Sequence, residues 1–297
     1  MKYGFIGLGE LGSKLAASLV KAGFELCVSD RDTARMKAIE GAVCESDITK
    51  LASSVDALIT CLPNPVISKA VLNSCLPFLK KGSTWIEMST VSREDVLELS
   101  ARAAEFDVDT LELPVTGGVH LAARAEITML VGGDKAVFQK HKAAIEVMGH
   151  RVFHMGPLGN ASIIKVITNM LAFIHLKATS EALMLAKRGG LDLKQAWEAI
   201  AASSGNSFVH ETEGALILSG SYDIGFDIDL ALKDLGFAGQ FGREFGVPLA
   251  LAALTEQSYV AAKAAFGGDA QSPMIAKLLE DQLGCDLRAP GFPTRLE

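Results

Sequence analysis

The stretch Gly7-Leu8-Gly9-Glu10-Leu11-Gly12 decides how the first half of this 297-residue sequence folds. The short apolar run Tyr3–Ile6 before it predicts a β-strand, and apolar residues at helical spacing over 15–20 predict a helix after it. In such a turn the first glycine permits the bend, the second lets a phosphate approach the backbone, and the third lets the helix pack on the strand. The order of the three elements therefore favours a dinucleotide-binding turn at a helix N-terminus over an ordinary tight turn.

The end of the next predicted strand carries two residues with opposing effects on the choice of dinucleotide. This strand covers Phe24–Ser29 and is followed by Asp30, whose carboxylate can accept hydrogen bonds from the adenosine ribose of NAD. Arg31 comes next, and a guanidinium at this place can bind the additional phosphate of NADP. Alternatively, Arg31 only begins a solvated helix. We predict that NAD or NADP is the cofactor, with a small preference for NAD.

Composition and charge limit the classes of protein to which this chain can belong. Its length suits two domains, and a hydrophobic content of 49% suffices for full cores. The formal net charge of −7 argues against nucleic acid or an anionic membrane surface as the main partner. We expect reduced thiols and no bound metal, because the cysteines show neither CxxC pairing nor metal-site spacing. These cysteines are Cys27, Cys44, Cys61, Cys75 and Cys285.

Two features of the sequence bear on location and assembly. The first predicted strand begins at about Lys2, which leaves no room for a signal peptide, so a cytoplasmic location is expected. The apolar stretch 161–186 is long enough to cross a bilayer, but it is interrupted by charged or strongly polar residues, which favour a buried helix and no membrane partner. They are Lys165, Asn169, His175, Lys177 and Glu181. The helix still carries more apolar surface than one small domain requires, which predicts a homodimer or homotetramer.

The pattern of predicted elements changes near residues 157–160. Before this point strands alternate with helical patterns such as Ser92–Glu105 and Asp134–Met148, which predicts a mainly parallel sheet with helices on both faces. After it, a helix over Ala161–Arg188 stops at Gly189-Gly190, and only helical periodicity follows to about Leu283. We therefore predict an α/β Rossmann-type doubly wound domain over 1–159 and an all-α domain over 160–297, joined by a long interdomain helix. The other predicted strands are Lys2–Ile6, Ala57–Leu62, Thr84–Met88, Val108–Leu113, Ile127–Val131 and Arg151–His154.

Small or polar residues follow three of the predicted strands. These are the turns Leu62-Pro63-Asn64, Ser89-Thr90 and Thr116-Gly117-Gly118. Each of them alone is an ordinary turn. In this architecture, however, ligands bind beyond the carboxyl ends of the strands, so three such turns at successive strand ends predict the floor of a binding site.

Two lysines in the second half are candidate residues for catalysis or binding. Lys165 and Asn169 lie four residues apart on the long predicted helix and so share one face. A lysine in these apolar surroundings is costly unless it reaches a cleft, where it is suited to proton transfer. The alternative is a lysine whose aliphatic stem is buried and whose ammonium reaches solvent. Lys233 opens the stretch Lys233-Asp234-Leu235 of a later predicted helix, where such a pair is usually only a solvated helix face.

Four motifs in the same order resemble the β-hydroxyacid dehydrogenases, the family that includes 3-hydroxyisobutyrate dehydrogenase and tartronate semialdehyde reductase. They are the fingerprint Phe5–Gly12, the substrate loop Leu113–Gly118, the catalytic motif from Gly156 through Lys165 to Asn169, and Lys233-Asp234-Leu235. The chain departs from the family at Glu10-Leu11, where pairs containing methionine are usual, and at Thr116, where serine is commoner. It also has Ala125-Glu126 where glycine and threonine are usual.

The resemblance implies hydride transfer between NAD(P) and a short β-hydroxy carboxylate, such as 3-hydroxyisobutyrate, or the reduction of a semialdehyde. It implies Lys165 as the proton-transfer group and Asn169 as a residue that orients the substrate hydroxyl or the lysine. It further implies that Thr116, Gly117 and Gly118 hold the substrate carboxylate. The cofactor is expected to contact the residues Gly7, Leu8, Gly9, Glu10, Leu11, Gly12, Asp30, Arg31, Leu62, Pro63, Asn64, Thr90 and Lys233.

Three other functions compete with this interpretation. A non-catalytic dinucleotide-binding scaffold is disfavoured because Lys165, Asn169 and the Thr116-Gly117-Gly118 loop are all present. A decarboxylating 6-phosphogluconate dehydrogenase resembles only the cofactor half, and the helical part here is short for it. An imine reductase is a third alternative, although such relatives generally lack the lysine.

Overall fold

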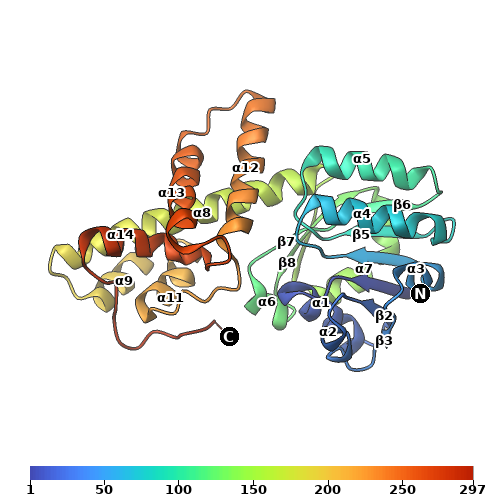
Figure 1. Cartoon of the computed structure of the whole chain (residues 1–297), viewed down its shortest axis with the longest axis horizontal. Coiled ribbons are helices and arrows are strands. Elements are labelled where there is room, and N and C mark those ends of the chain that lie inside the picture. Colours follow the sequence, from blue (N-terminus) through green and yellow to red (C-terminus); the bar gives the residue numbers. More distant parts are fainter. Residues whose placement is uncertain (297) are drawn as a thin grey trace. The chain divides into compact units, whose positions relative to one another are not determined.

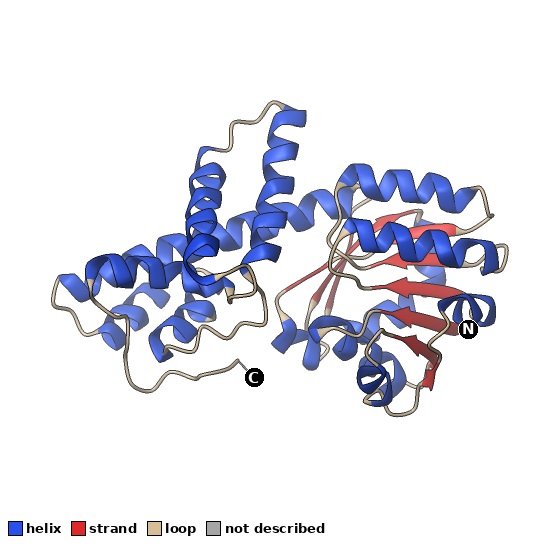
Figure 2. Ribbon diagram, viewed as in Figure 1, coloured by secondary structure: helices blue, strands red, loops and turns tan. Residues whose placement is uncertain are grey.

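The computed structural model describes residues 1–296, which cluster into two compact units, 1–165 and 166 onward. The first unit combines strands and helices, and the second consists of helices and loops (Figures 1 and 2). The Rossmann-type first part, the long helix and the helical second part predicted from the sequence are confirmed.

The first unit is built on one sheet in the order β3-β2-β1-β4-β5-β6-β8-β7, with β9 paired to β8. The six strands β1 to β6 are parallel, whereas β8 runs antiparallel to both β6 and β7. The order of the parallel strands reverses between β1 and β4, which is where an open α/β sheet binds its ligand. The strands are β1 (Lys2–Ile6), β2 (Glu25–Ser29), β3 (Val43–Cys44), β4 (Ala57–Thr60), β5 (Thr84–Glu87), β6 (Asp109–Glu112), β7 (Val115–Thr116), β8 (Thr128–Gly133) and β9 (Arg151–His154).

The strand boundaries differ from the sequence prediction at several places. The strand predicted over Ala57–Leu62 ends at Thr60, and the N–H of Leu62 donates to Ser89 Oγ (2.8 Å). The two-residue strands β3 and β7 were missed because two residues are too few to show periodicity. As a result Thr116, predicted in a turn, ends a short strand that pairs with β8.

Helices cover both faces of this sheet, and alternate strand residues serve the two layers. Ile59 and Ile86 belong to one buried apolar cluster, whereas Leu58 and Trp85 belong to another. This alternation follows from the two-residue period of a strand and confirms the doubly wound arrangement. The helices are α1 (Glu10–Lys21), α2 (Thr33–Lys37), α3 (Ile48–Ser54), α4 (Pro65–Cys75), the 3₁₀ turn η1 (Leu76–Phe78), α5 (Arg93–Ala104), α6 (Val119–Ala123) and α7 (Lys135–Met148).

The helix α8 (Asn160–Arg188) begins in the first unit and continues into the second. By length and composition it could cross a membrane, and 39% of its most apolar 18-residue window is buried within the protein. Its buried side chains Phe173, Leu176 and Leu183 belong to the core of the second unit. The remaining helices are α9 (Leu193–Ala201), α10 (Phe208–Glu211), α11 (Glu213–Ser219), α12 (Ile228–Phe245), α13 (Ala250–Phe266), the 3₁₀ turn η2 (Ser272–Met274) and α14 (Ile275–Leu283).

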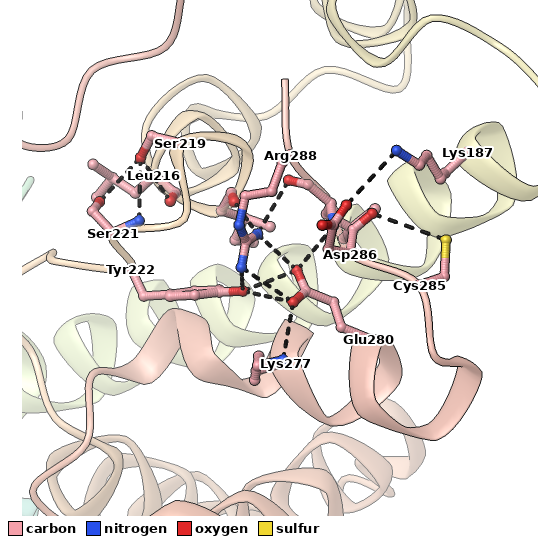
Figure 3. Close-up of polar contacts among 12 residues, drawn as sticks. Lys187, Leu216, Ser219, Ser221, Tyr222, Lys277, Glu280, Cys285, Asp286 and Arg288 are labelled. Carbon is pink, nitrogen blue, oxygen red and sulfur yellow. Dashed lines mark hydrogen bonds and ion pairs between the residues drawn. The ribbon is translucent and has the colours of Figure 1, made fainter. Parts of the chain in front are cut away.

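A buried carboxylate fastens the chain after α14 to the second unit (Figure 3). Glu280, 2% exposed, accepts hydrogen bonds from the hydroxyl of Tyr222 (2.9 Å), the N–H of Leu287 (3.2 Å) and the guanidinium of Arg288 (3.0 Å). Arg288 also donates to the carbonyl of Ile217. The segment predicted as an irregular tail from Arg288 is irregular over its described residues, but its beginning is held firmly.

Candidate functional site

The three glycines of the turn between β1 and α1 are explained by two different reasons. A Cβ atom on Gly7 would lie 2.2 Å from the carbonyl oxygen of Cys61, and one on Gly12 would lie 2.1 Å from the carbonyl oxygen of Gly7. At Gly9, by contrast, the nearest atom is Arg35 Nη1 at 3.8 Å. The protein's own packing thus requires the first and third glycines. Among the described residues other than its chain neighbours, only the end of the Arg35 side chain comes within 4 Å of a Cβ position at the second glycine, and no backbone atom does, which fits the close approach of a pyrophosphate.

The N-terminus of α1 directly follows Gly9. Its N-cap is Gly9, which has no side chain to accept hydrogen bonds from the first turn. The first N–H groups of a helix have no partner within the helix, and they attract anions together with the helix dipole. The residues Gly7 to Gly12 therefore fit the phosphates of a dinucleotide. The exposed Glu10 in the same turn adds a negative charge there.

The end of β2 is tied to the glycine-rich turn by Asp30. Its Oδ2 accepts a hydrogen bond from the N–H of Leu8 (2.7 Å), and its Oδ1 accepts one from the N–H of Asp32 (2.9 Å). Carboxylate oxygens can each accept about two hydrogen bonds, so this anchoring role is compatible with recognition of ribose hydroxyls. Arg31 is exposed beside it.

Arg35, on α2, is a residue that sequence reasoning missed. It lies next to Gly9 and forms an ion pair with Asp32 (Nε to Oδ2, 3.6 Å). The signal that could have revealed it was a second arginine shortly after β2, since Arg35 follows Arg31 by four residues.

The turns after β4 and β5 are joined by Ser89. Its hydroxyl oxygen accepts a hydrogen bond from the N–H of Leu62 and lies 3.2 Å from the hydroxyl of Ser68. Asn64 caps α4 by accepting a hydrogen bond from the N–H of Ile67 (3.0 Å), Pro63 is exposed, and Thr90 is half-buried. The structure thus brings the two predicted turns together and gives Asn64 a structural role as well.

Glu87, the last residue of β5, is a buried carboxylate that contacts the turn after β5. It is 1% exposed and its Oε1 accepts a hydrogen bond from the N–H of Ser89 (2.7 Å). Burial raises the pKa of the Glu87 carboxyl to about 7. Within the described chain its Oε2 makes no hydrogen bond of good geometry.

The predicted substrate loop follows β6. Thr116 is half-buried, and Gly117 and Gly118 have φ angles of +126° and +92°, a conformation that strongly favours glycine. A Cβ atom on Gly117 would also lie 2.8 Å from a methyl group of Leu121. The two glycines are therefore required by the course of the backbone, which places a hydroxyl and consecutive N–H groups at the end of β7.

The N-terminus of α8 is held by Glu112, which sequence reasoning also missed. This residue ends β6 and is 1% exposed. Its Oε1 accepts a hydrogen bond from the N–H of Ala161 (3.0 Å), and its Oε2 accepts hydrogen bonds from the N–H (2.9 Å) and hydroxyl (2.5 Å) of Ser162. Burial raises the pKa of the Glu112 carboxyl, and these donors oppose the shift. The signal in the sequence was an acidic residue within the apolar run Leu111-Glu112-Leu113. Lys165, 9% exposed, lies about one helical turn further along α8.

In the second unit, Asp234 joins two of the predicted residues. Its Oδ2 accepts a hydrogen bond from Asn169 Nδ2 (2.6 Å), and its Oδ1 forms an ion pair with Lys233 Nζ (3.2 Å). The ammonium of Lys233 also lies over the ring of Phe237, 5.7 Å from its centroid. Asp234, which is 1% exposed, thereby contacts both side chains, whereas the sequence analysis placed it in the motif Lys233-Asp234-Leu235 without a role of its own.

Among residues 1–296, no group of three or more His, Cys, Asp and Glu side chains is arranged to hold a metal ion. The site is instead made of a glycine-rich turn at a helix N-terminus, a hydroxyl-bearing glycine loop, and a buried lysine. A doubly wound sheet with this turn at the reversal of strand order is typical of dinucleotide-dependent oxidoreductases, among them those that use a nicotinamide cofactor.

Comparisons with known proteins agree with this class. Residues 2–156 match the family described as the NAD binding domain of 6-phosphogluconate dehydrogenase. Residues 159–279 match the family described as NAD-binding of NADP-dependent 3-hydroxyisobutyrate dehydrogenase. The chain belongs to the β-hydroxyacid dehydrogenase family, and the resemblance seen in its motifs is confirmed.

Relatives and solved structures match nearly the whole chain. The 2-(hydroxymethyl)glutarate dehydrogenase of Eubacterium barkeri is 34% identical over 96% of each chain. The mitochondrial 3-hydroxyisobutyrate dehydrogenase of Drosophila melanogaster is 32% identical over 86% of this chain and 82% of that protein. The crystal structure of 3-hydroxyisobutyrate dehydrogenase from Salmonella typhimurium superposes with a TM-score of 0.87 at 28% identity, covering 94% of this chain and 99% of that one. The chain is therefore an NAD(P)-dependent dehydrogenase rather than a scaffold.

Proposed function

We propose that the enzyme oxidises a short, unphosphorylated β-hydroxy carboxylate to its semialdehyde, or catalyses the reverse reduction. The observation that carries this proposal is the position of Lys165. This buried lysine lies on a helix whose N-terminus is bonded, through Glu112, to the strand that leads into the Thr116-Gly117-Gly118 loop. Glu112 thereby links the end of β6, four residues before the proposed carboxylate-binding loop, to the helix that carries the proposed proton-transfer group.

In this proposal the residues divide the work between binding and proton transfer. The nicotinamide supplies hydride transfer when bound. Thr116 Oγ1 and the N–H groups of Gly117 and Gly118 donate hydrogen bonds to the substrate carboxylate. Lys165 Nζ accepts the hydroxyl proton during oxidation and returns it during reduction. Asn169, held by Asp234, orients the hydroxyl or the lysine.

The proposed substrate class rests on the charges near the loop. Thr116 to Gly118 offer a hydroxyl and N–H groups, which suit one carboxylate. Arg124, on the adjacent segment, is exposed and paired with Glu126 (2.9 Å), so a phosphate would find no arginine cluster here. The names of the relatives support this class, since 2-(hydroxymethyl)glutarate and 3-hydroxyisobutyrate are both hydroxylated carboxylates.

A substrate panel that follows reduced nicotinamide by absorbance tests the proposal. The panel contains 3-hydroxyisobutyrate, 2-(hydroxymethyl)glutarate, L-threonate and tartronate semialdehyde, together with a phosphorylated sugar acid and an uncharged alcohol. We expect turnover with one or more of the first four. Preference for either of the last two would contradict the proposal.

The panel should also contain a cyclic imine. Solved imine reductases from Myxococcus stipitatus and Pseudomonas share this fold with TM-scores of 0.63 and 0.64 at 18% to 20% identity, which concerns the fold alone. Because Lys165 is present and buried, we expect little imine reduction. Imine reduction faster than hydroxyacid oxidation would favour the alternative function.

We further propose that the enzyme is a homodimer or homotetramer. Large apolar side chains on α13 are exposed, among them Leu251 (65%), Leu254 (64%) and Val260 (47%). On α8, Leu185 is 75% exposed. Exposed apolar surface of this kind marks protein interfaces. Light scattering at micromolar concentration should give at least twice the monomer mass, and L251E with L254E should lower it. A monomer mass for the wild type would refute the proposal.

A cytoplasmic location without a membrane partner is part of the same proposal. The support is the set of buried α8 side chains in the core of the second unit, because a membrane span would need that face for lipid. Fractionation of cells that express the chain should recover it without detergent. Recovery only with the membrane fraction would contradict this.

A further inference from the structure

Two glutamates occupy the same register at the ends of neighbouring strands, but only one of them reaches α8. Glu87 ends β5 and pairs with Glu112, which ends β6. Glu112 uses both carboxylate oxygens on the first turn of α8, through Ala161 and Ser162. An anion at this place satisfies N–H groups that have no partner within the helix and also opposes the helix dipole.

The structure makes room for this contact in the neighbouring strand. Gly132 of β8 lies opposite Glu112 in the antiparallel register. A Cβ atom on Gly132 would lie 2.1 Å from Glu112 Oε1 and 2.7 Å from its Cδ. The carboxylate is buried and held by three hydrogen bonds, so it could not move aside without losing them. Gly132 is therefore required for Glu112 to reach the helix.

The contact lies between the two parts of the proposed chemistry. Four residues after Glu112 the chain reaches Thr116, the first residue of the proposed carboxylate-binding loop. Three residues after Ser162, about one helical turn further, it reaches Lys165. One carboxylate thus joins the strand that positions the substrate to the turn of helix that positions the proton-transfer group.

We propose that Glu112 is the positioning residue for Lys165, with Gly132 as the site that admits its side chain. Glu112 touches neither substrate nor cofactor in this proposal, and it acts through the first turn of α8. Since the N-terminus of α8 is already filled by the protein's own carboxylate, it is closed to a substrate carboxylate or phosphate. This inference rests on the proposed role of Lys165.

The test compares E112Q and G132A with a matched control, E280Q. Glu280 is also a buried carboxylate that accepts a backbone N–H, but it fastens the chain after α14 in the second unit. In E112Q an amide N–H₂ group faces helix N–H donors, and in G132A the new methyl group displaces the carboxylate. We expect kcat to fall about 10–100-fold in both, because displacements of about 1 Å can cost 10²-fold. The Kd of the reduced cofactor should change less than about twofold.

The double variant E112Q/G132A separates positioning from a general loss of stability. If both substitutions act through one contact, the double variant should lose little more kcat than either single variant. E280Q should lower the melting temperature while leaving kcat near the wild-type value. Equal losses of kcat in E280Q and E112Q, or multiplicative losses in the double variant, would overturn the proposal.

Amide hydrogen exchange supplies a readout that needs no substrate. The N–H groups of Ala161 and Ser162, with the rest of the first turn of α8, should exchange faster in E112Q and G132A but not in E280Q. Unchanged exchange there would refute the positioning role even if the enzyme is active. If no substrate of the panel is turned over but exchange rises as expected, the proposed function fails and the structural contact stands.

Discussion

The N-termini of α1 and α8 differ in what lies beside the N–H groups of their first turns. Each helix follows a strand and a glycine-containing turn, and each presents N–H groups without helical partners. At α1 the N-cap is Gly9, and of the described side chains only the end of Arg35 comes within 4 Å of a Cβ position there. At α8 the carboxylate of Glu112 occupies the first turn. In the proposed function the first terminus receives the phosphate of a cofactor, whereas the second is already occupied by the protein's own carboxylate.

The largest loss of activity is expected from a substitution on α8, the helix whose first turn is bonded to Glu112. We expect K165A to fold and bind cofactor but to lose about 10²–10⁴-fold in kcat, because a positioned proton-transfer group is removed. The measurement is steady-state turnover, with cofactor affinity followed by fluorescence of the bound reduced nicotinamide. A kcat near the wild-type value would show that Lys165 is only a lysine with a buried stem.

Glu87 extends the comparison to a second buried carboxylate at a strand end. Unlike Glu112, it makes, among the described residues, no hydrogen bond to the N–H groups of α8. Its pKa is raised from 4.5 to about 7, so the folded state binds more protons than the unfolded state between these values. The free energy of unfolding should therefore fall by about 3 kcal/mol as pH rises from 4.5 to 7, at about 1.4 kcal/mol for each pKa unit. The loss should be complete above about pH 7.

The measurement for Glu87 is urea unfolding of the wild type and E87Q across this pH range. Burial lowers the pKa of His141 to about 4, which raises stability with pH over part of the same range. His141 is present in both proteins, so the difference between their free energies isolates Glu87. A difference that does not change with pH would show that Glu87 is not buried as a neutral acid.

At α1 the comparison can be tested with two alanine substitutions. G9A places a methyl group whose nearest described neighbour is the end of the Arg35 side chain, at 3.8 Å, so we expect a normal melting temperature but cofactor binding weakened about tenfold, or about 1.4 kcal/mol. G12A would bring a Cβ atom 2.1 Å from the carbonyl of Gly7, so it should lower the melting temperature as well. Calorimetry and cofactor titration distinguish the two. A G9A protein that binds cofactor normally would mean that no phosphate lies beside Gly9.

The smallest effect concerns the choice between NAD and NADP. Because Asp30 also holds the N–H groups of Leu8 and Asp32, D30N should weaken both cofactors while shifting kcat/KM toward NADP by about fivefold, or about 1 kcal/mol. R31A should shift it toward NAD by a similar factor, because the guanidinium no longer binds the additional phosphate. If neither variant changes the ratio of kcat/KM values, these residues do not recognise the ribose, and Arg35 becomes the candidate.

The sequence predicted the first unit well because its elements are regular and its signals are local. The glycine spacing, the alternation of strands and helices, and the long helix ending before Gly189 all depend on residues close together in the chain. The short strands β3 and β7 were missed for the opposite reason, since pairing partners decide them.

Three residues were not predicted as site residues because their roles depend on long-range contacts, which sequence periodicity does not encode. They are Glu112, Asp234 and Arg35. Glu112 meets Ser162 fifty residues later in the chain, and Asp234 meets Asn169 sixty-five residues earlier. A buried charge is costly without such partners, so an acidic residue within an apolar run was the available signal.

Amide hydrogen exchange with and without NADH tests the contrast between the two helix N-termini most directly. If phosphates complete α1 and Glu112 completes α8, cofactor should slow exchange in residues 9–13 and leave residues 161–164 unchanged. Protection at the start of α8 with none at the start of α1 would contradict this account.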